Sequence, residues 1–155
     1  MPQMKPLEEW ICDSCGKIVD AGGGWVEWLS GSATAAGPHS FRIVHHQPSC
    51  HRHTHAFDRA DLHLTAFIGA PGLQLFLSML DVGPLLSPSV QPHQPEMRSF
   101  VDTIRRLHIH YYEEARQYMA EAQSDGYFGD QNEVSVFLPE TCKAIIARYG
   151  SAQRA

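Results

Sequence analysis

The sequence predicts an α+β fold, in which a small β module over residues 7–58 precedes a helical part over residues 59–150. Two observations support this order. Segments rich in aromatic and β-branched residues, which favour strands, lie near the N-terminus. After residue 96, apolar residues recur at three- and four-residue steps, as in amphipathic helices. With 155 residues, the chain can form one compact domain or a small module joined to a larger core.

The β module is predicted from two strand-like segments. Residues 25–29 are aromatic and β-branched and follow three glycines, and residues 41–45 have the composition of a returning strand. The small residues of segment 30–40 predict a loop between them. Residues 51–61 have mixed polarity and no clear period, so we expect a loop or an irregular extension there.

Three stretches predict three or four helices. Pro71 suits the first turn of a helix that ends near Leu80 and has its leucines and Phe76 on one face. Residues 97–122 have the clearest period and predict one long helix or two abutting ones. A last helix is expected from Pro139 to Gly150. Residues 83–96 are rich in proline and predict a linker within the helical part.

Two pairs of side chains have the types and spacing of a structural zinc site. Cys12 and Cys15 form a C-x-x-C pair, and Cys50 follows either His45 or His46 at an allowed spacing. Zn²⁺ suits such a set because it binds both thiolate and imidazole in tetrahedral geometry. The two histidines would point to opposite faces of a regular strand, so the sequence leaves both as candidate ligands.

With Gly16 directly after the first pair, these residues resemble the zinc-ribbon and zinc-knuckle families over about a third of the chain. The resemblance implies a three-stranded β core around one Zn²⁺ ion, with nucleic-acid or protein binding as common uses. The chain departs from these families in its second pair, where a histidine and a longer gap replace the usual C-x-x-C.

Other polar and aromatic side chains have plainer interpretations. His51, His53 and His55 would share a face of an extended chain, which favours a solvated polar strip and leaves an auxiliary metal or proton-relay site as the alternative. The following are predicted to lie on a solvated helix face: Arg105, Arg106, His108, His110, Glu113 and Glu114. Trp10, Trp25 and Trp28 are expected to form the core of the β module. Cys142 lies on an apolar helical stripe and is expected to be buried.

Composition excludes several classes of protein. The formal net charge is −5, which counts against broad binding of a phosphate backbone. No apolar run approaches the roughly 20 residues that cross a bilayer. The N-terminus has no apolar segment of the kind found in secretory signals, so a cytoplasmic location is expected.

These observations predict a zinc-stabilised binding or regulatory protein without enzymatic activity, whose partner is another protein or a second copy of the chain. The G-x-S-x-G and H-E-x-x-H motifs are both absent. Two alternatives stay open. A metal-dependent hydrolase could use His45 or His46, because this strand end resembles the start of an HNH-type nuclease motif. A DNA-binding regulator could act through the helical part, although the charge does not favour nucleic acid.

Overall fold

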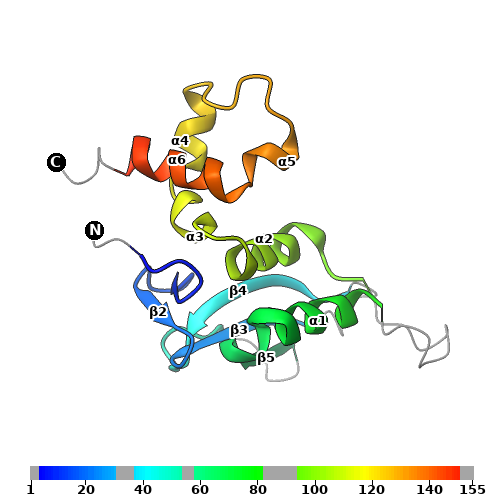
Figure 1. Cartoon of the computed structure of the whole chain (residues 1–155). Coiled ribbons are helices and arrows are strands. Elements are labelled where there is room, and N and C mark those ends of the chain that lie inside the picture. The colour runs from blue at the N-terminus through cyan, green and yellow to red at the C-terminus, as the bar shows by residue number, and fades with distance from the viewer. Residues whose placement is uncertain (1–3, 31–36, 54–57, 82–93, 151–155) are drawn as a thin grey trace.

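The computed structural model describes residues 4–30, 37–53, 58–81 and 94–150 (Figure 1). Strands come first and helices follow, so the predicted α+β class is confirmed. The strands are β1 (Glu9–Ile11), β2 (Ile18–Asp20), β3 (Gly24–Leu29), β4 (His39–His45) and β5 (Arg59–His63). The helices are the 3₁₀ helix η1 (Leu64–Phe67), α1 (Gly69–Leu80), α2 (Met97–His108), α3 (Tyr112–Ala115), α4 (Met119–Ser124), α5 (Glu133–Val136) and α6 (Pro139–Tyr149).

The strands form two antiparallel sheets. β1 pairs with β2 in a short hairpin, and the second sheet has the order β4-β3-β5. Both strands predicted for the module are present as β3 and β4. The prediction of a loop or irregular extension over residues 51–61 is wrong for its last residues, because β5 begins at Arg59. This segment lacks β-branched residues and becomes a strand by pairing along β3, from Leu29↔Arg59 to Trp25↔His63.

One face of the three-stranded sheet carries the first hydrophobic core. Val26 and Ile43 contribute from the sheet, and Phe67, Phe76 and Phe100 contribute from η1, α1 and α2. Trp10 belongs to this core and is fully buried, whereas Trp25 and Trp28 are partly buried against it. The sheet and core therefore continue past residue 58, and the division into two domains at that position stays a prediction.

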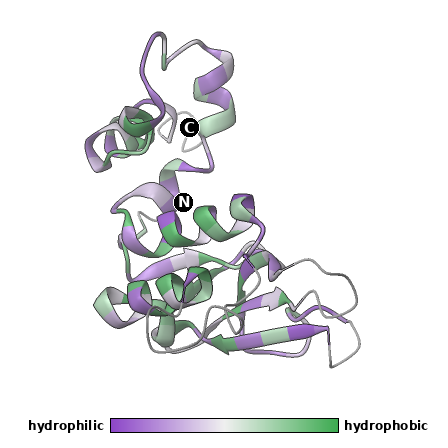
Figure 2. Cartoon of the chain, turned by 90° about the vertical axis from the view of Figure 1, so that its right-hand side faces the viewer, coloured by the Kyte–Doolittle hydropathy of each residue, from purple (hydrophilic) through white to green (hydrophobic). Residues whose placement is uncertain are grey.

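A second core lies between the C-terminal helices, above the sheet in Figure 1. Its buried members are Tyr112, Ala115, Tyr118, Ala122, Phe128, Cys142, Ile145 and Tyr149. The expected burial of Cys142 is confirmed. Figure 2 shows that the helices carry both polar and apolar segments, as helices packed on one side do. No helix in the described ranges is both long and apolar enough to cross a membrane.

The helical part is more broken than the sequence predicts. The last helix is confirmed as α6, with Pro139 in its first turn. The single or double helix expected over residues 97–122 is three helices. The first break follows from Ile109, which is extended, and Tyr111, which has a left-handed φ of 67°, and the second is a turn over residues 116–118. The apolar period survives these short interruptions and so does not reveal them. On α1, Phe76 is buried but Leu73 and Leu77 are 44% and 49% exposed, so its apolar face is only partly covered.

Gly72 allows α1 to lie directly against η1. A Cβ at this position would lie 1.9 Å from the carbonyl carbon of Phe67. We expect Gly72→Ala to lower the free energy of unfolding by about 1–3 kcal/mol, as overpacking does, although alanine normally favours a helix by about 1 kcal/mol. Urea unfolding measures the change, and Gln74→Ala on the exposed face of α1 is the control. A more stable Gly72→Ala protein would contradict the close approach.

Candidate metal centre

The first two cysteines lie in the turn of the β1-β2 hairpin. The Cys12 amide donates to the carbonyl of Lys17 at 2.9 Å, and the Gly16 amide donates to the carbonyl of Cys12 at 2.9 Å. Gly16 has a φ of +71°, a conformation that glycine adopts without steric cost. These hydrogen bonds close a tight knuckle, which turns the side chains of Cys12 and Cys15 to the same side.

The second pair comes from the end of β4 and the turn after it. His45 is the last residue of β4, and the Cys50 amide donates to the carbonyl of Gln47 at 2.9 Å. The Gln47 side-chain amide donates to Cys50 Sγ at 3.0 Å. Arg42 Nη2 donates to the Cys50 carbonyl at 3.0 Å. The turn is therefore fixed from both its own residues and the neighbouring strand.

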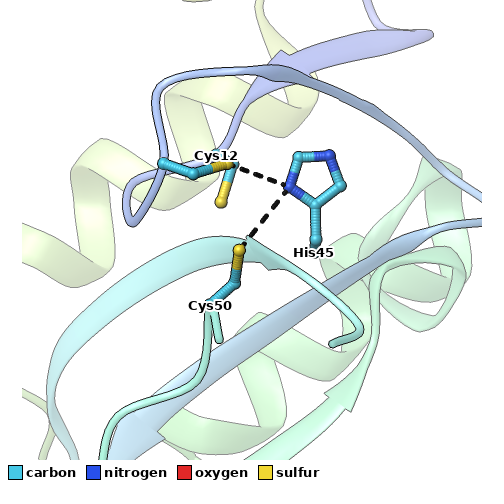
Figure 3. Close-up of side chains that lie close together, drawn as sticks. Cys12, His45 and Cys50 are labelled. Atoms are coloured by element: carbon cyan, nitrogen blue, oxygen red, sulfur yellow. Dashed lines mark hydrogen bonds between the residues drawn. The ribbon is translucent and has the colours of Figure 1, made fainter. Parts of the chain in front are cut away.

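The four side chains converge between the two sheets. One ligand atom from each of Cys12, Cys15, His45 and Cys50 lies within 4.8 Å of every other. His45 Nδ1 is 3.4 Å from Cys15 Sγ and 4.0 Å from Cys50 Sγ. Figure 3 shows Cys12, His45 and Cys50 pointing toward one another. The four residues lie close enough to hold a metal ion.

The hydrogen bonds of His45 define which ring nitrogen faces the cysteines. His45 Nε2 lies 3.1 Å from the carbonyl oxygen of Ile18, which can only accept, so Nε2 carries the proton. Nδ1 then has a free lone pair directed at the sulfur atoms. Metal-binding histidines commonly donate their second ring N–H to a backbone carbonyl in this way.

His46 lies outside this group. Its ring stacks on Trp25, with the ring centroids 4.3 Å apart. It also lines an open hollow of about 400 Å³ together with Trp25 and His51. Of the five residues that the sequence offers as ligands, the structure brings together Cys12, Cys15, His45 and Cys50.

The environment of the thiols favours a thiolate within the group. Burial raises the pKa of Cys12, but hydrogen bonds from the backbone of Cys15, His45 and Ser14 outweigh burial and lower that pKa to about 6. The backbone of Lys17 lowers the pKa of Cys15, but desolvation and the thiols of Cys12 and Cys50 outweigh it and raise that pKa. The thiolate is therefore favoured at Cys12 and the thiol at Cys15, and a metal ion held by this group would favour the thiolate form of both.

Three sulfur atoms and one imidazole nitrogen are a ligand set that fits zinc, since Zn²⁺ binds both donor types in tetrahedral structural sites. Cys12 and Cys50 are each 1% exposed, so the group lies at the edge of the first core. Only Cys15 among the cysteines of the group is exposed. A set of four protein ligands leaves no open position for a substrate.

Two buried carboxylates support the two halves of the centre, and sequence reasoning missed both. Glu27 is 0% exposed and receives a hydrogen bond from His51 Nδ1. Glu113 is 5% exposed and pairs with Arg106, which is 2% exposed. The predicted solvation of His51, Arg106 and Glu113 is therefore wrong. No periodic pattern marks these residues, because their partners are far away in the sequence.

No family model, curated protein or solved structure matches this chain. The resemblance to zinc ribbons and zinc knuckles is thus limited to the pattern and the grouping of the ligands. In those families a three-stranded β core surrounds the ion. Here the four candidate ligands come from the turn of a two-stranded hairpin, and from the end of β4 and the turn after it in a separate three-stranded sheet.

Proposed function

We propose that this protein is a zinc-stabilised binding or regulatory protein of the cytoplasm, in which Cys12, Cys15, His45 and Cys50 bind one structural Zn²⁺ ion. The grouping of these four ligand atoms within 4.8 Å is the observation that carries the proposal. An ion held by four protein ligands fastens the β1-β2 hairpin to the end of β4. Its role is then to stabilise the fold, since Zn²⁺ without an open position does not activate water.

Two tests address the ion. The purified protein is expected to contain one Zn²⁺ per chain, and X-ray absorption is expected to show three Zn–S distances near 2.3 Å and one Zn–N distance near 2.0 Å. His45→Ala should weaken Zn²⁺ binding by at least the roughly 10- to 100-fold that loss of a supporting partner costs. His46→Ala is the matched control and should retain the ion. Equal loss in both variants, or no bound metal in the wild-type protein, would contradict the proposal.

The proposed partner is another protein or a second copy of this chain. Leu73 and Leu77 are four residues apart on α1, and both are exposed. Neighbouring exposed leucines on one helix face are typical of surfaces that bind proteins. A DNA-binding role has less support, because Arg106 is buried and Arg105 covers the ring of Phe137 at 3.7 Å. Light scattering over a range of concentrations tests whether a second copy is the partner.

A hydrolase is the second candidate, and one observation favours it. His51 lines the hollow beside His46, and Glu27 Oε2 lies 2.9 Å from His51 Nδ1. Carboxylates hold the imidazole of a general base in this manner in many hydrolases. Hydrolysis that His46→Ala or His51→Ala abolishes without unfolding the protein would favour this candidate. So would a Zn²⁺ ion with three protein ligands and one water molecule.

A further inference from the structure

Asp13 lies between the first two cysteines of the metal centre in the sequence. Its carboxylate contacts residues of β4 and of the helical part. Asp13 Oδ2 accepts a hydrogen bond from the Ile43 amide at 2.7 Å and from Arg106 Nη1 at 2.5 Å. The Asp13 amide donates to the Ile43 carbonyl at 2.8 Å. Asp13 Oδ1 also lies 3.8 Å from Arg116 Nη1. The knuckle is therefore bonded both to β4 and to the helical part.

Arg106, on α2, is the centre of this network. Its guanidinium donates to Glu113 at 2.7 Å from Nε and at 2.9 Å from Nη2. Nη2 also donates to the carbonyl of Ile11, the last residue of β1, at 2.8 Å. A planar guanidinium presents its donors in a fixed fork, so the positions of all three partners depend on one another. With 2% of its surface exposed, Arg106 has little water to replace a lost partner.

Glu113 links the β1-β2 hairpin to the C-terminal helices through hydrogen bonds with Ile11 and Arg106. Its Oε1 accepts a hydrogen bond from the Ile11 amide at 2.8 Å, in addition to that from Arg106. Glu113 belongs to α3, whose neighbours Tyr112 and Ala115 are part of the second core. On the opposite side, the Trp10 indole donates to the carbonyl of Arg106 at 3.0 Å. The position of α3 is thus fixed by the same residues that shape the knuckle.

We propose that metal binding at the knuckle and docking of helices α3–α6 are coupled through Asp13, Arg106 and Glu113. The inference rests on the proposed function, because it needs a metal ion at Cys12 and Cys15. Metal binding holds the knuckle in the conformation in which Asp13 meets Arg106. Loss of the ion frees the knuckle, leaves buried charges without their full set of partners and loosens the docking of α3.

Coupling of this kind is reciprocal. If the ion stabilises the docked helices, then the docked helices must raise the affinity for the ion by the same factor. Typical couplings between two sites in a protein change affinity by about 5- to 150-fold. A change at Arg106, which touches no ligand, should therefore weaken Zn²⁺ binding.

Two measurements on the full chain test the coupling. Hydrogen exchange of α3–α6 is measured with Zn²⁺ and after its removal by a chelator, and faster exchange of these helices is expected without the ion. Zn²⁺ affinity is measured by competition with a chromophoric chelator for Arg106→Lys, which keeps the charge but loses the fork, and for Arg106→Met. A loss of about 10-fold or more is expected. Arg98→Met, at an exposed position of α2, should bind like the wild type.

The outcomes separate this inference from the proposed function. A wild-type chain that binds no Zn²⁺ would overturn both. A wild-type chain that binds Zn²⁺, shows the same exchange in α3–α6 with and without the ion, and has an Arg106→Lys variant of unchanged affinity would overturn the coupling alone. If Arg106→Met does not fold, hydrogen exchange in the wild-type chain and the Zn²⁺ affinity of Arg106→Lys still test the coupling.

Discussion

Removal of Zn²⁺ with a chelator is expected to lower the midpoint of thermal unfolding by roughly 8–16 °C. A free ligand at about 1,000 times its dissociation constant stabilises a folded protein by about 4 kcal/mol, and 1 kcal/mol shifts the midpoint by about 2–4 °C for a chain of this size. Cys12 and Cys50 belong to the first core, so we expect removal of the ion to destabilise the packing of Trp10 and Val26 as well. Differential scanning calorimetry with and without the chelator measures the shift.

A pair of cysteine variants controls this experiment. Cys50→Ser removes a ligand and is expected to give a low midpoint that no longer responds to Zn²⁺. Cys142→Ala changes a buried cysteine of the second core, outside the metal centre, and should keep the full response. An unchanged midpoint after verified removal of the ion would mean that the first core holds this region without a metal.

The sequence predicts the parts of this fold that depend on short-range patterns. The C-x-x-C pair with Gly16 after it needs only local spacing, and the four ligands that the structure brings together all belong to the predicted set. Strand β3 follows from its aromatic and β-branched composition, and helix α6 follows from its apolar period, because Cys142, Ile145 and Tyr149 are buried along one stripe. Pro139 marks the start of α6 at the first position of the helix.

The parts that the sequence did not predict depend on contacts between distant residues. Strand β5 forms because β3 offers an edge to pair with. His45 and His46 both have an allowed spacing to Cys50, and only the carbonyl of Ile18 and the ring of Trp25 distinguish them. Arg106 resembles its neighbour Arg105 in sequence, yet one is buried against the hairpin and the other lies on an aromatic ring. Periodicity carries no information on such partners.

Glu27→Gln is expected to lower the free energy of unfolding by about 3–5 kcal/mol, the typical cost of removing one partner from a buried charge pair. Glu27 is 0% exposed in the middle of β3, and Arg42 Nε and the Arg52 amide both donate to its Oε1. Burial raises the pKa of Glu27, but the hydrogen bonds from His51 and Arg42 outweigh it and keep that pKa below its usual value. The carboxylate is thus charged in the folded protein, and both of its oxygens accept hydrogen bonds.

Asp61→Asn is the matched control for Glu27→Gln. Asp61 lies opposite Glu27 on β5 and pairs with Arg59 at 3.1 Å. Its side chain is 23% exposed and that of Arg59 is 31% exposed, so water competes for this pair. We expect the free energy of unfolding, measured in guanidinium chloride for both variants, to change by less than about 1 kcal/mol in Asp61→Asn. Similar losses in both variants would mean that burial of Glu27 has no special effect.

Glu27 should also influence the metal centre, because its partners hold the segment that contains Cys50. Arg42 donates both to Glu27 and to the Cys50 carbonyl, and His51 follows Cys50 directly. Zn²⁺ affinity should therefore fall in Glu27→Gln and stay unchanged in Asp61→Asn.

The double variant Glu27→Leu with Arg42→Met separates two causes of this loss. Replacing both members of a buried ion pair by apolar residues is often neutral or stabilising, whereas removing one member strands the other. If the stranded guanidinium causes the loss of stability, the double variant recovers most of the free energy of unfolding. Its Zn²⁺ affinity stays low even so, because a methionine cannot donate to the Cys50 carbonyl as Arg42 does. Recovery of both quantities would show that the position of Cys50 does not depend on Arg42.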